Sequence, residues 1–134
     1  MSDAWHFLGS TPLPRLGKLT LRGGAWRLPT GDQRHDPVLH VGTTVGVVPF
    51  VDQEHVLLIR QFRHLTRVDS WELPGGGGQP GEEPEAAAQR ELREEGGYRA
   101  GRLTFLARFY PSIGYLDYSA YCYIGEQVVA DSLA

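Results

Sequence analysis

The sequence predicts an α+β domain in which one helix packs on a mixed β-sheet. The chain has 134 residues, 41% of them apolar, which is the size and composition of a single globular domain. Several segments are rich in β-branched and aromatic residues, as strands are. One segment, residues 85–95, consists of strong helix formers. Strands, one helix and further strands give the order of an α+β or α/β/α domain.

The first part of the chain is expected to hold little regular structure. Residues 1–17 are punctuated by Pro and Gly and are expected to be irregular. Residues 18–28 alternate in polarity, which predicts two short strands or one strand broken by Gly23–Gly24. Residues 28–37 are expected to form a turn and a loop.

The central part predicts a hairpin that leads into a run of glycines. Residues 38–50 are rich in β-branched residues and predict a long, largely buried strand, with residues 55–62 as its hairpin partner. Residues 63–70 are polar and are expected to form a loop. Residues 71–73 predict a short strand that enters Gly75–Gly78, which are expected to form a flexible loop.

The second half predicts the helix and two more strands. Pro84 suits the first turn of a helix over residues 85–95, and Gly96–Gly97 is expected to end it. Residues 102–111 and 118–125 predict strands joined by a loop. No second substantial helix follows, so we expect either a partner chain over the other face of the sheet or a shortened C-terminus.

Negative charge is concentrated in one segment. The net charge is −3, and residues 82–95 contain six glutamates and two arginines, which amounts to −4. The arginines are scattered and form no basic stripe, which argues against a nucleic-acid partner. The charge therefore indicates a local site.

Cysteine usage and hydropathy indicate the cytoplasm. The single cysteine, Cys122, cannot form an internal disulfide and lies in an apolar run, where we expect a buried side chain. The first ten residues lack a basic stretch followed by an apolar one, so no secretory signal is expected. No apolar run approaches eighteen residues, so no membrane span is expected.

Three glutamates share one face of the expected helix. Glu91, Glu94 and Glu95 are spaced i, i+3, i+4, which places them within an arc of roughly 100°. Their mutual repulsion and their oxygen ligands suit a hard cation such as Mg²⁺ or Mn²⁺. Arg90 can neutralise part of the cluster and orient the carboxylates. A solvated acidic face is the alternative, and the preceding glycines favour a site because they let backbone approach a ligand.

The segment from Gly76 to Tyr98 resembles a known signature. It reads as Gly76, five residues, Glu82, seven residues, and then Arg-Glu-Leu-Arg-Glu-Glu-Gly-Gly-Tyr over residues 90–98. This is similar to the signature of the Nudix hydrolases, with Tyr98 as a variant at the final apolar position. Residues 59–76 and 108–117 further resemble the ADP-ribose pyrophosphatase branch of that family. The resemblance implies an α/β/α sandwich on a mixed sheet.

The resemblance also implies a reaction and a metal site. Members of the family hydrolyse a nucleoside diphosphate linked to another moiety, with Mg²⁺ as cofactor and Mn²⁺ as a possible substitute. Glu91 and Glu95 would be the principal metal ligands, and Glu94 would share a metal, water or base role. Gly75 would add a backbone carbonyl, and Arg90 would orient the glutamates.

For the substrate, a nucleotide sugar, the resemblance points to residues outside the signature. Arg63 would contact a phosphate or the terminal ribose, although it could equally end a strand in water. Ser112 and Gly114 match the specificity loop of the branch. Trp26 and Trp5 could stack on an adenine, and packing in a core or a dimer is the alternative for both.

Two departures bear on activity and specificity. Ile113 replaces the proline of the specificity loop, and Tyr118 stands where the branch has a glutamate, which leaves Asp117 as the nearby acid.

We expect an N-terminal strand region over residues 1–37 that serves dimerisation or substrate binding, and a Nudix domain over residues 38–134 without its usual C-terminal helix. The alternatives to a nucleoside diphosphate sugar hydrolase are a Nudix hydrolase of nucleoside triphosphates or other nucleoside diphosphate derivatives, and a catalytically weak nucleotide-binding or regulatory protein.

Overall fold

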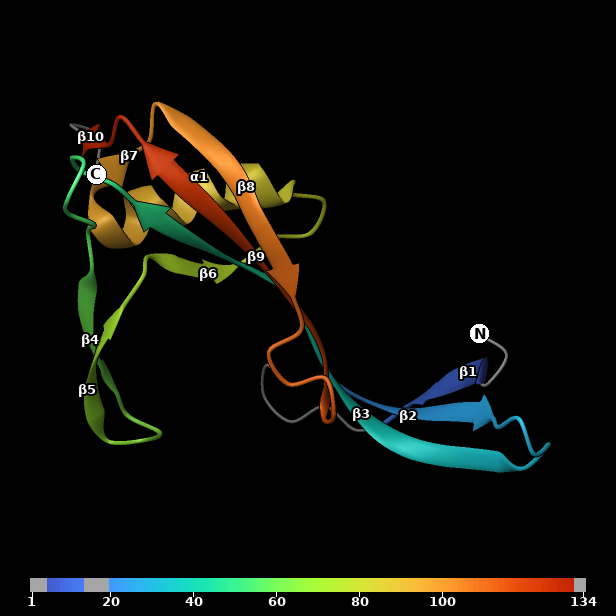
Figure 1. Ribbon diagram of the computed structural model, residues 1–134. Helices are drawn as coiled ribbons and strands as arrows, with labels where there is room; N and C mark the ends of the chain where they lie inside the picture. The colour runs from blue at the N-terminus through green and yellow to red at the C-terminus, as the bar shows by residue number, and fades with distance from the viewer. Residues whose placement is uncertain (1–4, 14–19, 132–134) are drawn as a thin grey trace. The chain divides into compact units, whose positions relative to one another are not determined.

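The chain divides into two compact units, each described here by itself. The computed structural model describes residues 5–13 and 20–131 (Figure 1). The first unit comprises the described residues up to Gly42 together with Ser112–Tyr118, and the second comprises Thr43–Pro111 and the described residues from Ser119 onward. The division of the chain at residue 37 stays a prediction.

The first unit is an antiparallel meander. Strand β1 (His6–Pro12) pairs with β2 (Thr20–Arg27), and β2 pairs with the first part of β3 (Gln33–Pro49). The expectation of irregular structure was wrong for residues 6–12, because their backbone groups pair with β2. The turn ends earlier than expected, so that residues 33–37 belong to β3.

The two glycines of β2 do not break the strand. Gly24 is buried, and a Cβ built on it would lie 2.0 Å from the Trp26 ring. The indole therefore lies across Gly24, in space that any other residue would fill. The Trp26 ring also contacts the ring of Phe7 on the neighbouring strand β1, with 5.8 Å between the ring centroids.

The second unit is built on a mixed sheet. In it β3 is flanked by β6 (Gly75–Gly77) and by β9 (Leu116–Glu126), and β8 (Arg102–Phe109) lies beyond β9. The pairs β3–β6 and β8–β9 are antiparallel, whereas the arrowheads of β3 and β9 point the same way (Figure 1). The strands predicted over residues 38–50, 102–111 and 118–125 are confirmed, with shifted ends.

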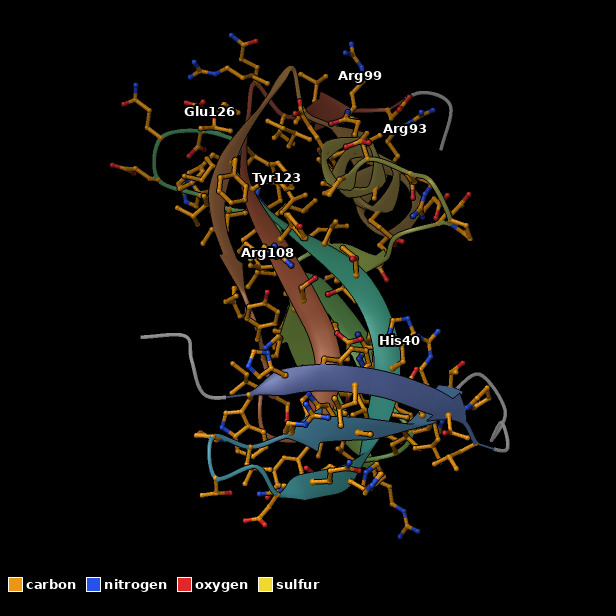
Figure 2. All side chains as sticks on the ribbon, turned by 90° about the vertical axis from the view of Figure 1, so that its right-hand side faces the viewer. His40, Arg93, Arg99, Arg108, Tyr123 and Glu126 are labelled. Carbon is orange, nitrogen blue, oxygen red and sulfur yellow. The ribbon has the colours of Figure 1, made fainter. Side chains whose placement is uncertain are left out.

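The predicted helix is confirmed as α1 (Pro84–Gly96), which covers one face of this sheet. Gly97 ends it in the left-handed conformation, with φ of 72°, where glycine is favoured. The core of the unit lies between helix and sheet, and the side chain of Tyr123 is on that side of β9 (Figure 2). The buried apolar residues of this core are Val45, Val47, Ala87, Ala88, Leu92 and Tyr123.

The segment between β3 and the glycines differs from expectation. Residues 55–62 do not form a hairpin with β3 beyond one bridge between Phe50 and Val56. Instead β4 (Ile59–Arg63) pairs with β5 (Val68–Glu72), so the loop expected over residues 63–70 is confined to the turn at 64–67, and the other four residues are strand. Both edges of β3 are already paired, one with β6 (Gly75–Gly77) and the other with β9 (Leu116–Glu126), so residues 59–63 pair with β5 instead.

The glycine run is a strand where a flexible loop was expected. Gly75–Gly77 form β6 and pair with β3. A Cβ on Gly75 would lie 2.3 Å from the carbonyl oxygen of Val45, so the absent side chain is what allows this close approach. The backbone entering the helix is therefore fixed.

The end of the described chain is attached to the end of the helix. Strand β10 (Val129–Ala130) pairs with β7 (Tyr98–Arg99), and the Asp131 carboxylate lies 2.6 Å from Nε of Arg93. Figure 2 shows Arg93 beside the helix end. The helix of the described residues is too short and too polar to cross a membrane.

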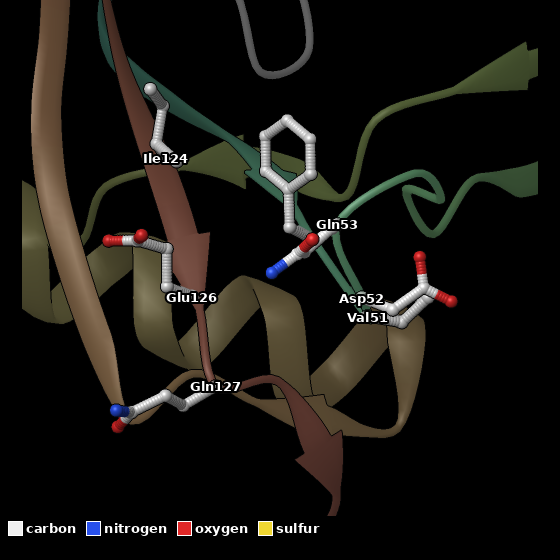
Figure 3. A pocket seen from close by; sticks show the side chains of 7 residues that line it. Val51, Asp52, Gln53, Ile124, Glu126 and Gln127 are labelled. Atoms are coloured by element: carbon white, nitrogen blue, oxygen red, sulfur yellow. The ribbon is translucent and has the colours of Figure 1, made fainter.

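The sheet face opposite α1 carries an open cavity of about 520 Å³. Phe50, Val51 and Ile124 supply apolar lining, and Figure 3 shows Ile124 and Glu126 on the near side of the strands, with the helix behind. Cys122, expected to be buried, is half-buried, and this burial raises the pKa of its thiol. No second helix covers this face within the described residues.

Candidate functional site

Arg90 lies at the centre of the acidic cluster on α1. Its Nε and Nη2 each donate to the Glu82 carboxylate at 2.9 Å, and Nη2 also donates to the carbonyl of Gly77 at 2.9 Å. Its Nη1 donates to Glu91 at 2.7 Å and to Glu94 at 3.0 Å. The hydrogen bonds to Glu82 and Glu91 raise the pKa of Arg90 further above its ordinary value, so the guanidinium stays charged.

Glu82 is a structural partner of this arginine. The hydrogen bond from Arg90 and one from the backbone N–H of Gln79 hold the pKa of the Glu82 carboxyl below its usual value. Helix and preceding loop are joined by this pair, since Glu82 lies before the first turn of α1. A planar arginine bound by both oxygens of a carboxylate has a defined orientation.

Glu91 is the buried member of the row. It is 8% exposed, and a Cβ built on Gly76 would lie 2.6 Å from its Oε2. The carboxylate therefore rests on the bare backbone of β6 on one side and on Arg90 on the other. Such two-sided support fixes the direction of a buried charge, which would otherwise be costly.

Glu95 and Glu94 lie further along the helix in a more exposed setting. Oε2 of Glu95 accepts the backbone N–H of Gly75 at 2.9 Å, and Oε1 accepts Nε2 of Gln61 at 3.1 Å. The Glu94 side chain is 58% exposed. Gly75 thus presents its amide to Glu95, while a role for its carbonyl stays a prediction.

The donor set suits a hard divalent cation. Glu91, Glu94 and Glu95 offer oxygen ligands from one helix face. As they stand, no three acidic, His or Cys side chains in the described part of the chain converge as a metal cage. Arg90 engages one oxygen each of Glu91 and Glu94, and within the described residues the other oxygen of each has no hydrogen-bond partner. The carboxylates fit a metal, with side-chain rotation completing the site.

Arg63 lies in the same unit as these glutamates and is already paired. It donates from Nε to Glu72 of β5 at 2.7 Å, and from Nη2 to the second oxygen of that carboxylate. This pairing raises the pKa of Arg63 and lowers the pKa of Glu72. Glu95 is close enough to add to the favourable potential at Arg63.

The other expected substrate residues belong to the first unit. Trp26 and Gly114 line one cleft of about 470 Å³, together with Tyr115. The carbonyl of Ser112 accepts the N–H groups of residues 115 and 116, which closes the turn around Gly114. The structure thus brings Trp26 and Gly114 together, and it groups Arg63 with the helix.

Several residues of the site were not anticipated from the sequence. Gln61 binds Glu95, and Gly76 supports Glu91. Gln61 stands in the Gln-Phe-Arg element beside Arg63, so its position was visible although its partner was not. In the first unit, Asp117 lies 2.9 Å from Nδ1 of His40, a contact between strands far apart in sequence.

Comparisons with known proteins agree with this geometry. The family model of the NUDIX domain matches residues 40–130. The ADP-ribose pyrophosphatase of Bacillus subtilis (strain 168) is 36% identical over 75% of the chain and 55% of its own length. The ADP compounds hydrolase NudE of Escherichia coli (strain K12) is 36% identical over 66% of the chain and 47% of its own length.

A solved structure shares the fold. The crystal structure of an ADP compounds hydrolase superposes with a TM-score of 0.81 at 25% identity, over 96% of the chain and 70% of that structure. The chain spans about half the length of the curated relatives it matches.

Proposed function

The chain belongs to the Nudix domain family, and we propose that it hydrolyses the pyrophosphate bond of ADP-ribose or of a related nucleoside diphosphate sugar. The products would be a nucleoside monophosphate and a sugar phosphate. Mg²⁺, with Mn²⁺ as a substitute, would be the cofactor.

One observation carries the proposal: a single half-buried arginine organises the glutamates of the helix. Arg90 binds Glu82, Glu91 and Glu94 at once, which holds three like charges close together. A solvated acidic face would need no such centre. The names of the relatives, ADP-ribose pyrophosphatase and ADP compounds hydrolase, support the choice of substrate class.

Each residue of the helix has a role in this proposal. Glu91, Glu94 and Glu95 would hold the metal, and the Gly75 carbonyl would add a ligand. The metal, when bound, supplies positive charge for the pyrophosphate and lowers the pKa of water. Arg90 holds the carboxylates of Glu91 and Glu94 in place by one hydrogen bond to each.

Residues outside the helix are proposed to contact the substrate. Arg63 would bind a phosphate or the terminal ribose, in competition with its ion pair to Glu72. Trp26, Ser112 and Gly114 are proposed to contact the nucleotide, since Trp26 and Gly114 line one cleft. An indole offers a base a stacking surface worth about 1–3 kcal/mol.

The experiment is a hydrolysis assay on metal-free protein to which Mg²⁺ or Mn²⁺ is added. We expect turnover of ADP-ribose, weaker turnover of dinucleotides and nucleoside triphosphates, and none in excess EDTA. Glu95→Gln should lower turnover by on the order of 10³-fold, because a metal supplies several kcal/mol to the transition state.

The matched control is Glu85→Gln, which removes the same charge from the first turn of α1. It should leave turnover within about twofold, since surface changes away from a site cost little. Binding of ADP-ribose without turnover of any substrate would replace the hydrolase with a nucleotide-binding protein. Faster turnover of nucleoside triphosphates than of ADP-ribose would make nucleoside triphosphates the substrate class in place of nucleoside diphosphate sugars.

A further inference from the structure

Arg108 of β8 has aromatic rings where other arginines of its unit have a carboxylate. Its guanidinium carbon lies over the rings of Tyr110 and Tyr121, 5.3 Å from each ring centroid. Arg102, on the same strand, instead forms an ion pair with Glu126 of β9. Among the described residues of the second unit, no carboxylate pairs with Arg108, and its side chain is exposed. Its positive charge is therefore uncompensated within the unit and open to a ligand.

The two tyrosine rings restrict this guanidinium without neutralising it. Tyr121 is half-buried on β9, and Tyr110 follows the end of β8, so the rings approach Arg108 from its own strand and from the neighbouring one. Each such contact contributes about 0.5–1 kcal/mol at an exposed site. A planar guanidinium offers a phosphate two parallel N–H donors, and a restricted one loses less entropy on binding. Arg108 is therefore suited to a phosphate group.

An exposed aromatic ring lies on the same face of the sheet. Phe105 of β8 is 55% exposed, and its ring centroid is 6.4 Å from that of Tyr121. Register places Phe105 opposite Tyr123 and Arg108 opposite Tyr121. These two tyrosines are two residues apart on β9, so the two pairs share one face and are about 7 Å apart along the strands. Figure 2 shows Tyr123 and Arg108 on these strands.

The spacing and the chemistry of these two residues fit a mononucleotide. In a nucleoside monophosphate one ribose joins the base to the phosphate, which is a span of the same order as that between Phe105 and Arg108. An aromatic ring gives a base a stacking surface worth about 1–3 kcal/mol. A nucleic-acid strand would need several positive charges along its backbone. The only other basic residue of β8 and β9 is Arg102, which is already paired with Glu126.

We propose that Arg108 and Phe105 form a binding site for a nucleoside monophosphate, with the phosphate on Arg108 and the base on Phe105. Strand β8 is at the edge of its sheet, so the ligand reaches the site without displacing another strand. The site uses none of the glutamates of α1 and needs no metal. The inference rests on the proposed function only for the source of the ligand, since that hydrolysis would release a nucleoside monophosphate.

The test is a titration of isotope-labelled protein with AMP, inorganic phosphate and adenosine in excess EDTA, followed by the NMR shifts of the backbone amides. AMP should bind saturably and shift the amides of residues 105–110 and 121–123. It should bind at least about tenfold more tightly than inorganic phosphate or adenosine, because base and phosphate contribute together. EDTA removes metal, so binding through the helix glutamates does not contribute.

Three variants separate the two halves of the site from general attraction by charge. Arg108→Gln should weaken the binding of AMP and of inorganic phosphate at least about tenfold, because a charged donor is lost. Phe105→Leu should weaken AMP about fivefold or more and leave inorganic phosphate unchanged, which also shows that the variant is folded. Arg99→Gln removes the same charge from β7, where Figure 2 shows the side chain directed away from the core, and it should bind AMP as the parent chain does.

Four results would overturn the proposal. The first is the absence of saturable shifts at residues 105–110. The second is AMP binding that survives Arg108→Gln, which would place the nucleotide elsewhere, as in the cleft lined by Trp26. The third is AMP that binds no more tightly than inorganic phosphate, and the fourth is an equal loss in Arg99→Gln and Arg108→Gln. None of them bears on the hydrolase assay, which is read with metal at the helix.

Discussion

Helix α1 with its glycine strand and the β4–β5 hairpin are neighbours in sequence, yet they distribute polarity in opposite ways. In the helix the apolar side chain of Leu92 is buried, and Arg90 pairs with the carboxylates of Glu91 and Glu94. In the hairpin one face is polar, and the aromatic rings of Phe62 and Trp71 are exposed. The helix therefore buries its apolar groups and pairs charges near Arg90, whereas the hairpin leaves two aromatic rings exposed.

This difference teaches where the stability of the unit lies. The helix is fixed from both sides, by the sheet through its apolar face and by Gly76 and Arg90 at its carboxylates. The hairpin touches the site through Gln61, and Phe62 and Trp71 of β4 and β5 are largely exposed. Truncations in the helix should therefore cost more stability than truncations of these two rings.

The largest expected effect contrasts two truncations. Leu92→Ala should lower the free energy of unfolding by about 2–5 kcal/mol, because Leu92 is fully buried and its loss leaves a cavity. Trp71→Ala should change it by no more than about 0.5 kcal/mol in dilute monomer, because the ring is largely in water already. Urea unfolding followed by circular dichroism measures both values.

An equal loss of unfolding free energy in Leu92→Ala and Trp71→Ala would contradict this contrast between helix and hairpin, because Trp71 would then contribute as much to stability as a core residue.

The next effect contrasts two adjacent glycines of β6. Gly76→Ala places a methyl group 2.6 Å from the Glu91 carboxylate, which is buried and cannot move away freely. The affinity for Mn²⁺ should fall by about 10–100-fold, as it does when a support of a metal ligand is lost. Gly77→Ala is the matched control, because a Cβ there meets no atom within 4 Å.

Titration calorimetry with Mn²⁺ reads this prediction without any assay of turnover. Unchanged affinity in Gly76→Ala would show that Glu91 does not hold the metal in the position the structure gives it. A loss of affinity in Gly77→Ala of equal size would show that strand β6, and not the contact with Glu91, governs binding.

Local periodicity explains how much of the site the sequence predicted. The order Arg90, Glu91, Glu94, Glu95 lies on one helix, so helical spacing alone places these side chains on adjoining positions. The helix and its end at Gly97 were predicted for the same reason, because capping residues act over one turn. The site roles themselves stay predictions until metal and turnover are measured.

Contacts between distant segments explain what the sequence did not predict. Residues 59–63 are suitable for pairing with either β3 or β5, and they pair with β5 because β6 and β9 occupy the two edges of β3. The glycines at 75–77 indicated flexibility, whereas their function is to let backbone approach Val45 and Glu91. Nothing in the sequence around Gln61 indicated that it would bind Glu95, which is 34 residues away.

The smallest expected effect concerns Glu82 at low pH. Arg90 holds the pKa of Glu82 below its ordinary value of 4.5 in the folded chain. Because the unfolded chain binds this proton more readily, the stability that the pair contributes is full above about pH 4.5 and is lost as the pH falls through the lowered folded value. In Glu82→Gln that contribution is missing at every pH.

The gap in unfolding free energy between the parent chain and Glu82→Gln should therefore be constant near neutral pH and should narrow below about pH 4.5. Urea unfolding at a series of pH values measures it. A gap that stays constant down to the acid limit would mean that Arg90 does not stabilise the ionised carboxylate. In that case packing, and not the ion pair, would hold Arg90 and Glu82 in place. The helix would then differ from the hairpin only in how deeply its side chains are buried.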